Sequence, residues 1–165
     1  MPKELTKKVF LDEVERDLNG MFNELVSTVV TELVSDSREG GYSPVLTGFF
    51  ASSWKASTQP IPLDDPIRNF PRWANIKTVN TGSRTVLAPG YKPIIDRRYP
   101  IPKVTIKDTV YISNPATYSA YTYASPKSKV LHYIQGGPLD EAINRVFKDK
   151  RDTISVASNA PTKYS

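Results

Sequence analysis

The sequence predicts an α+β fold, and three observations lead to this prediction. Apolar residues recur at steps of three and four near the N-terminus, which is typical of a long amphipathic helix. Apolar and polar residues alternate over short stretches in the middle, which is typical of strands. A second helical pattern follows Pro138 near the C-terminus. With 165 residues, of which 39% are hydrophobic, the chain is expected to form a single domain over residues 1–165 with its own core.

The first element is a helix over about residues 5–35. Its apolar stripe consists of Leu11, Val14, Leu18, Phe22, Leu25, Val29 and Leu33. At about 1.5 Å per residue, such a helix is longer than a small domain is wide. We therefore expect part of it to pack on another subunit; the alternative is a helix that lies entirely across its own sheet. Gly40 and Gly41 end the helix, because glycine accepts the left-handed conformation found at helix ends.

Residues 47–54 (TGFFASSW) predict a turn followed by a strand. Thr47 and Gly48 form the turn, and the alternation from residue 49 to residue 56 has the period of two that a strand requires. Phe50 and Trp54 fall on one face of this strand, so they are predicted to anchor the core.

Residues 59–103 form a proline-rich insertion, with eight of the fourteen prolines. This density rules out long helices and central strands, yet the segment is too apolar for a disordered linker. We predict an ordered, extended insertion with short strands near residues 74–79 and 85–88. It is expected to act as an assembly arm that contacts another chain; the alternative is a loop folded back on its own sheet. The expected inter-subunit contact residues are Arg68, Arg72, Arg97, Arg98 and Tyr99.

The C-terminal third predicts one further strand region and one helix. Residues 104–112 form a β segment in which residues 107–108 are either a hairpin turn or an exposed break, and Asn114-Pro115 ends it. Residues 117–124 suit a short helix. The last helix begins at residues 136–138, with proline in the favoured first turn. The polar residues 152–165 predict an extended tail.

No catalytic or metal-binding pattern is present. The chain has no cysteine, and its one histidine, His132, is expected to be a half-buried structural residue. Asp64 and Asp65 are adjacent, but further carboxylates at strand ends are lacking. We therefore predict no catalytic residues, no metal, no cofactor and no enzymatic activity. No apolar run approaches the roughly 20 residues of a membrane span, so no membrane association is expected.

Charge is distributed unevenly. Residues 1–36 hold four cations and eight anions, net −4, whereas residues 37–165 hold eighteen cations and nine anions, net +9. An acidic helix and a basic body can complement each other between neighbouring copies; the alternative is that both are solvated faces. The basic, aromatic-rich residues 68–99 also suggest a second function, a non-enzymatic nucleic-acid-binding protein that grips phosphates and stacks on bases, with Trp73, Tyr91 and Tyr99 as the aromatic groups.

Two short segments carry a resemblance to a known family. Residues 47–54 and residues 114–121 (NPATYSAY), in this order and after a long helix, resemble the small tail-completion or head–tail joining (neck) proteins of long-tailed bacteriophages. The positions that match the family's two motifs are Thr47, Gly48, Phe50, Ser53, Trp54, Asn114, Tyr118 and Tyr121.

The resemblance implies a fold, a location and partners. Similar proteins have a small antiparallel β-sheet packed by a long N-terminal helix and a shorter C-terminal helix. It implies a structural virion protein, assembled in the host cytoplasm, in a homo-oligomeric ring of six or twelve copies. Such a ring joins the head connector, on the portal side, to proteins on the tail-tube side. The genomic DNA passes through it with transient contact.

Overall fold

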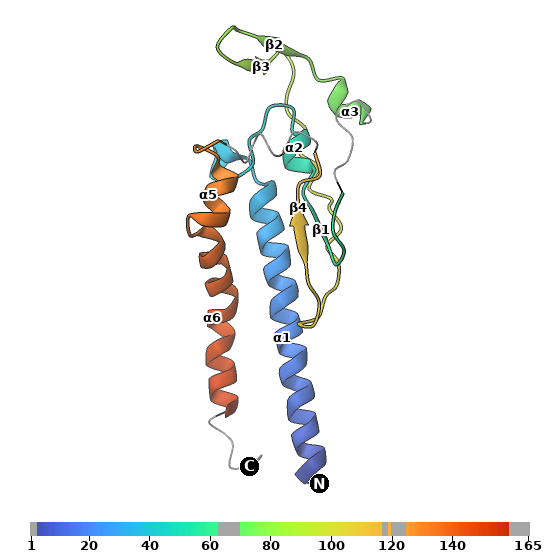
Figure 1. The fold of residues 1–165 in the computed structure, drawn as a ribbon, viewed down its shortest axis with the longest axis vertical. Helices are drawn as coiled ribbons and strands as arrows, with labels where there is room; N and C mark the ends of the chain where they lie inside the picture. Colours follow the sequence, from blue (N-terminus) through green and yellow to red (C-terminus); the bar gives the residue numbers. More distant parts are fainter. Residues whose placement is uncertain (1–2, 63–69, 117–118, 120–124, 159–165) are drawn as a thin grey trace.

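A computed structural model of the chain describes residues 3–62, 70–116, 119 and 125–158, and it confirms the α+β fold (Figure 1). The elements, in order, are α1 (Lys3–Val34), the 3₁₀ helix η1 (Ser37–Glu39), α2 (Phe49–Ser52), β1 (Lys55–Ser57), α3 (Pro71–Ala74), β2 (Thr78–Asn80), β3 (Thr85–Leu87), β4 (Tyr111–Ser113), α5 (Lys129–Gln135) and α6 (Pro138–Ser158).

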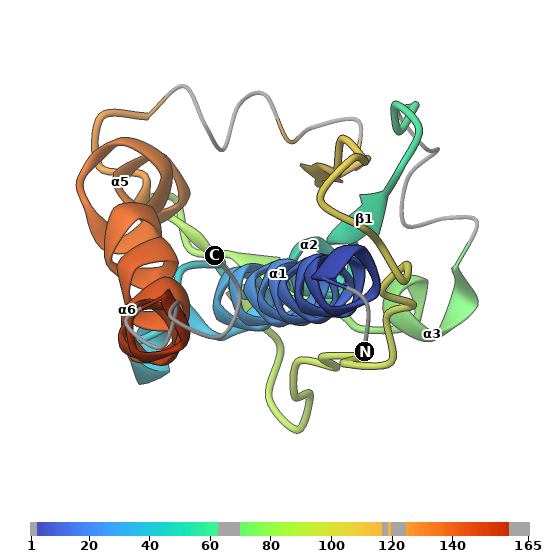
Figure 2. The ribbon, with the colours of Figure 1, turned by 90° about the horizontal axis from the view of Figure 1, so that it is seen from below.

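The long helix α1 is the central element. It runs antiparallel to α6 on one side, and the ribbon formed by β1 and β4 lies on its other side (Figures 1 and 2). The strands form two separate antiparallel ribbons, β1 with β4 and β2 with β3. In the first ribbon Ala56 lies opposite Ile112, and in the second Val79 lies opposite Val86. The β2–β3 hairpin lies at one end of the molecule, away from the long helices (Figure 1).

The core is built on the C-terminal half of α1. Its main cluster combines residues from α1, α2 and its C-terminal flank, and α5: Val29, Val30, Leu33, Val34, Phe50, Trp54, Val130 and Tyr133. A second cluster joins Phe49 to Trp73 and Ala116. Phe50 and Trp54 are buried, so the prediction that they anchor the core is confirmed.

The N-terminal turns of α1 have little cover. They extend past the end of α6 and past the β1–β4 ribbon (Figure 1). The Val9 side chain is 45% exposed and that of Leu11 is 54% exposed, although Leu11 begins the apolar stripe. Over the described residues, no helix is long and apolar enough to span a membrane.

The predicted strand over residues 49–56 is wrong in its first half. Residues 49–52 form the helical turn α2, in which the Ser52 N–H donates to the Gly48 carbonyl at 3.0 Å, and only Lys55–Ser57 is a strand. Phe49, Phe50 and Ala51 are all buried. Three consecutive residues cannot all face one side of a strand, so the helical turn satisfies their burial where a strand cannot.

The predicted β segment over residues 104–112 is a strand only at its end, Tyr111–Ser113. Residues 105–108 form a turn, closed by a 3.0 Å bond from the Asp108 N–H to the Thr105 carbonyl. Residue 104 pairs with a side chain of α1 instead of a strand. The insertion holds the two strands predicted near residues 74–79 and 85–88, but residue 74 belongs to the unpredicted helix α3.

The C-terminal region differs from the prediction in three places. Helix α5 was not predicted; Ser128 caps it by accepting a bond from the Leu131 N–H, and Tyr133 enters the core. His132 is exposed on this helix rather than half-buried. Helix α6 begins at Pro138 as predicted but continues to Ser158, so the predicted extended tail is wrong for residues 152–158. Residues 159–165, and the short helix predicted at 117–124 apart from Ser119, lie outside the described residues.

Candidate functional site

The two family-like segments meet in one buried place, which we call the motif junction (residues 47–54 and 114–116). Asn114 is 1% exposed, and its Nδ2 donates to the Phe50 carbonyl oxygen at 2.7 Å. Its Oδ1 accepts from the Ala116 N–H at 3.2 Å. The Asn114 side chain therefore bonds to a carbonyl of α2 and also stabilises the turn of the backbone after β4. Asparagine suits this position because its side-chain amide is both a donor and an acceptor.

Gly48 makes a close backbone contact possible at the motif junction. It has φ +93°, and a Cβ built on it would lie 1.9 Å from the Ile94 carbonyl oxygen. The Ile94 N–H donates to the Thr47 carbonyl at 2.8 Å in the same contact. Only glycine fits here, because the left-handed conformation and the approach of a second backbone both exclude a side chain.

The insertion is bound to the motif junction through residues 94–96. The Ser52 hydroxyl donates to the Ile94 carbonyl at 3.3 Å and accepts from the Asp96 N–H at 2.7 Å. The Trp73 Nε1–H donates to the same Ile94 carbonyl at 2.8 Å. Both flanks of the β2–β3 hairpin thus pack into the intramolecular core, and among the described residues of the insertion the hairpin is the part that projects as expected of an arm (Figure 1).

Ser53 and Trp54 complete the junction. The Ser53 hydroxyl donates to the Phe49 carbonyl at 2.6 Å, which stabilises the single turn of α2. The Trp54 Nε1–H donates to Ser43 Oγ at 2.8 Å, and that hydroxyl donates to the Leu33 carbonyl at the end of α1. All of these bonds are made within the chain and are buried or part-buried, so Ser52 and Ser53 act as structural donors and acceptors.

The expected inter-subunit residues are partly engaged within the chain. Arg72 and Arg98 both pair with Asp96, at 3.1 and 3.2 Å. The pKa of Asp96 is lowered, chiefly because the Arg98 side chain donates to its carboxylate. Tyr99 is half-buried against the core, and its hydroxyl lies 2.8 Å from Thr31 Oγ1 of α1.

Arg97 remains exposed. Arg68, Tyr118 and Tyr121 lie outside the described residues, so nothing follows for these three predicted positions. The motif junction accordingly brings together Thr47, Gly48, Phe50, Ser53, Trp54 and Asn114.

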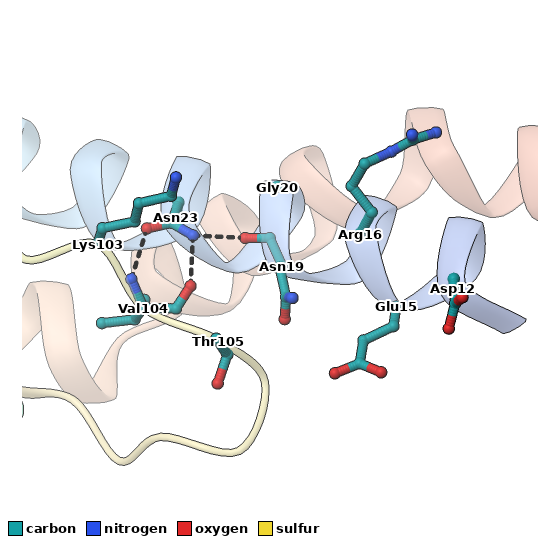
Figure 3. A pocket seen from close by; sticks show the side chains of 9 residues that line it. All are labelled: Asp12, Glu15, Arg16, Asn19, Gly20, Asn23, Lys103, Val104 and Thr105. Carbon is teal, nitrogen blue, oxygen red and sulfur yellow. Dashed lines mark hydrogen bonds between the residues drawn. The ribbon is translucent and has the colours of Figure 1, made fainter.

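A second polar site, the asparagine clamp, fixes the far end of the insertion to α1. Asn23 Nδ2 donates to the Val104 carbonyl at 2.6 Å, and Asn23 Oδ1 accepts from the Val104 N–H at 2.9 Å (Figure 3). Asn19 Oδ1 accepts from the Ile106 N–H at 2.9 Å. The side-chain amide of Asn23 thus pairs with the backbone of Val104 as a neighbouring strand would. No sequence pattern signals it, because isolated asparagines in a helix have many uses.

The clamp lies beside an open hollow of about 960 Å³ between α1 and residues 103–105 (Figure 3). Its charged lining is mixed, with Asp12 and Glu15 beside Arg16 and Lys103. A smaller apolar hollow of about 330 Å³ lies between the middle of α1, β4 and the α5–α6 corner, and includes Phe22, Ile112 and Ile143. The Thr105 hydroxyl in the lining of the larger hollow donates to Asp108 at 3.1 Å, so it holds the turn at residues 105–108.

One buried phenol joins three helices near the apolar hollow. The Tyr133 hydroxyl of α5 donates to Glu32 of α1 at 2.7 Å, and Arg145 of α6 contacts the other oxygen of that carboxylate at 2.5 Å. Burial, followed by the bond to Glu32, raises the pKa of Tyr133 well above its usual value. The phenol is therefore neutral at ordinary pH and acts as a fixed donor.

No model of a known protein family matches the sequence, and no curated protein or solved structure is significantly similar to it. The residues themselves therefore carry the functional argument. Within residues 3–62, 70–116, 119 and 125–158, no group of three or more acidic or histidine side chains is placed to hold a metal ion.

Proposed function

We propose that this protein is a structural component of the neck of a long-tailed bacteriophage. Copies form a ring of six or twelve subunits that joins the head connector to the tail and leaves a passage for DNA. The observation that carries the proposal is the motif junction. The segments that carry the resemblance are about 60 positions apart in the chain, and the Asn114–Phe50 bond joins them directly. Two motifs that belong to one structural unit are expected to contact each other, and these two segments do so.

The uncovered part of α1 supports assembly into a ring. A ring needs two different faces on each subunit, so that one face meets the other on the next copy. The exposed Val9 and Leu11 offer one apolar face, beyond the region that the chain covers itself. The insertion offers a basic face, which complements the acidic first 36 residues.

The role is geometric rather than catalytic. Polar side chains at the motif junction are hydrogen-bonded to backbone carbonyl groups, as those of Asn114, Ser52 and Ser53 are. The alternative function, nucleic-acid binding by base stacking on residues 68–99, receives less support. Trp73 is buried and its Nε1–H is bonded to Ile94, so its ring offers no free face for a base. Tyr99 is half-buried against the core, with its hydroxyl beside Thr31 of α1.

The direct test combines mass and location. Native mass spectrometry of the purified chain, alone and with the neighbouring connector and tail proteins, is expected to give a closed ring of six or twelve copies. Immunogold labelling of purified virions is expected to mark the head–tail junction. A chain that stays monomeric with both neighbours, and that is absent from virions although present in the infected cell, would overturn the proposal.

A further inference from the structure

The basic charge of the chain is concentrated on the insertion and its flank. Residues 70–107, all of them described, contain eight cations and one anion, a net charge of +7, whereas the whole chain has only +5. The remainder of the protein is therefore net negative. The single anion, Asp96, is already paired with two arginines.

Five cations of residues 70–107 are in no described ion pair, and three of them lie on the β2–β3 hairpin and next to it; the other two are Arg97 and Lys103. Lys77, Arg84 and Lys92 are exposed, and none of the ion pairs in the described part of the chain includes them. Residues 70–95 contain no acidic residue at all. The hairpin stands clear of the long helices at one end of the molecule (Figure 1).

The hairpin register places two of the cations on one face. The Ala88 N–H bonds to the Lys77 carbonyl and the Thr81 N–H to the Arg84 carbonyl, each at 2.9 Å, so residues 77 and 88 pair, as do 81 and 84. Residues 77, 79 and 81 share a face by alternation, and Arg84 lies opposite Thr81. Lys77 and Arg84 are thus separated by four residue steps along the ribbon, about 13 Å.

This arrangement fits the backbone of a nucleic acid. Each DNA strand carries a charge about every 3.4 Å along the helix axis, so two cations about 13 Å apart reach different phosphates of one strand. In the tip between them, the Thr81 hydroxyl donates to the Arg84 carbonyl and the Gly82 N–H donates to Asn80 Oδ1, so these groups hold the turn together. The exposed Ser83 takes part in none of the described hydrogen bonds, so its hydroxyl adds one donor of the kind that binds phosphates. A protein–protein contact of this size normally needs a large aromatic or apolar anchor. Between residues 76 and 92, all of them described, Val79 is the sole exposed large apolar side chain.

We propose that the β2–β3 hairpin is a sequence-independent binding site for the phosphate backbone of double-stranded DNA. Binding is by charge and hydroxyl groups, without base stacking. The choice of DNA as the polyanion is consistent with the proposed neck role and rests on it in part. The hairpin then contacts the DNA that the ring encloses.

The test measures binding of the full-length chain to a fluorescent 20-base-pair duplex of arbitrary sequence, by anisotropy, over a range of salt concentrations. The Lys77→Glu/Arg84→Glu variant is compared with Lys8→Glu/Lys148→Glu, which makes the same change in net charge at exposed positions on the long helices. A Lys77→Gln/Arg84→Gln variant serves if charge reversal impairs folding, and circular dichroism checks each protein.

We expect the hairpin variant to bind about tenfold more weakly than the helix variant, and the slope of log K against log salt to fall by about 1.8, or about 0.9 for each lost phosphate contact. Equal affinities of the two variants would overturn the inference. Equal binding of wild-type protein to poly-glutamate and to the duplex would also overturn it, in favour of an acidic protein partner. Ring formation is measured on the same samples, so rings that do not bind DNA refute the hairpin site alone, and DNA binding without rings refutes the neck role alone.

Discussion

Asn114 donates a hydrogen bond of 2.7 Å to the carbonyl oxygen of Phe50, inside the core and across 64 positions of sequence. The same side chain accepts from the Ala116 N–H, so one residue closes the turn after β4 and fixes α2. A buried residue in this position is sensitive to substitution, because each unpaired buried group costs about 1–3 kcal/mol.

The first prediction concerns this residue. Asn114→Ala leaves the Ala116 N–H without its partner and removes one of two hydrogen bonds to the Phe50 carbonyl, which keeps the bond from the Ser53 N–H at 3.0 Å. It is expected to lower the free energy of unfolding by about 1–3 kcal/mol. Urea denaturation followed by tryptophan fluorescence measures this. Asn144→Ala, at an exposed position of α6, is the matched control and should change stability by less than about 0.5 kcal/mol. Similar midpoints for the two variants would contradict the role of Asn114.

Two glycines with the same backbone conformation allow two effects of a Gly→Ala substitution to be measured separately: the strain of the left-handed conformation and the clash of the new Cβ with a neighbouring backbone. Gly48 and Gly82 both have positive φ, but a Cβ on Gly48 meets the Ile94 carbonyl at 1.9 Å, whereas one on Gly82 meets nothing within 4 Å. Gly82→Ala is expected to cost about 1–2 kcal/mol, the ordinary cost of the left-handed conformation. Gly48→Ala should cost at least about 2 kcal/mol more, measured by thermal unfolding. Equal losses would show that residues 94–96 adjust freely.

The asparagine clamp is predicted to hold the insertion against α1. Asn23→Leu removes both bonds to Val104, and amide exchange at residues 104–106 is expected to accelerate about tenfold, while the core of α1 keeps its protection. Hydrogen–deuterium exchange with mass spectrometry resolves the segment. Glu24→Leu, at the exposed neighbouring position, is the control and should leave exchange there unchanged. Unaltered exchange in Asn23→Leu would mean that other contacts hold the segment.

Stability at low pH is predicted to depend on Asp36. Its carboxylate caps η1 and receives two-pronged bonds from the Arg38 guanidinium, which hold its pKa below the usual 3.8. Because the folded-state pKa is the lower one, the stabilisation is complete above about pH 3.8 and is lost as the pH falls through the folded-state value.

Asp36→Asn and Arg38→Gln should therefore each reduce the loss of stability between pH 5 and pH 2.5. Urea midpoints at the two pH values measure it, and both variants should be less stable than the wild type at pH 7. A wild-type pH profile in Arg38→Gln would show that the arginine is not the cause.

How much the sequence predicts depends on the length of the pattern. Helix α1 and the part of α6 before residue 152 follow from periodicity sustained over several turns and from the proline at the start of α6. The strand predicted for residues 49–52 is wrong, because a stretch of eight residues with apolar side chains on both faces fits the period of a strand and that of a helix equally well. The Asn23–Val104 pairing could not be predicted, since it joins positions 81 apart in the sequence. The Asn23 side-chain amide makes the two bonds to Val104 that the backbone of a neighbouring strand would make. At the motif junction the sequence identified most of the residues but not the part that Ile94 plays in joining them.

The last prediction tests whether the uncovered end of α1 forms a subunit interface. Burying a leucine side chain contributes about 1.5–3 kcal/mol, so Leu11→Asp is expected to weaken self-association by about 10–100-fold per interface. Leu11 is 54% exposed, so the subunit itself should stay folded. Sedimentation velocity over a concentration series measures the association.

Leu46→Asp is the matched control, because Leu46 is also exposed, at 38%, but lies outside α1. A general effect of an added negative charge would weaken both variants alike, whereas an interface on α1 affects Leu11→Asp alone. If Leu11→Asp associates as the wild type does, the N-terminal end of the apolar stripe of α1 is not a subunit interface, and other surfaces of the subunit must form the contacts of the ring. If both variants lose association to the same extent, the loss reflects the added negative charge and the proposed interface on α1 is contradicted.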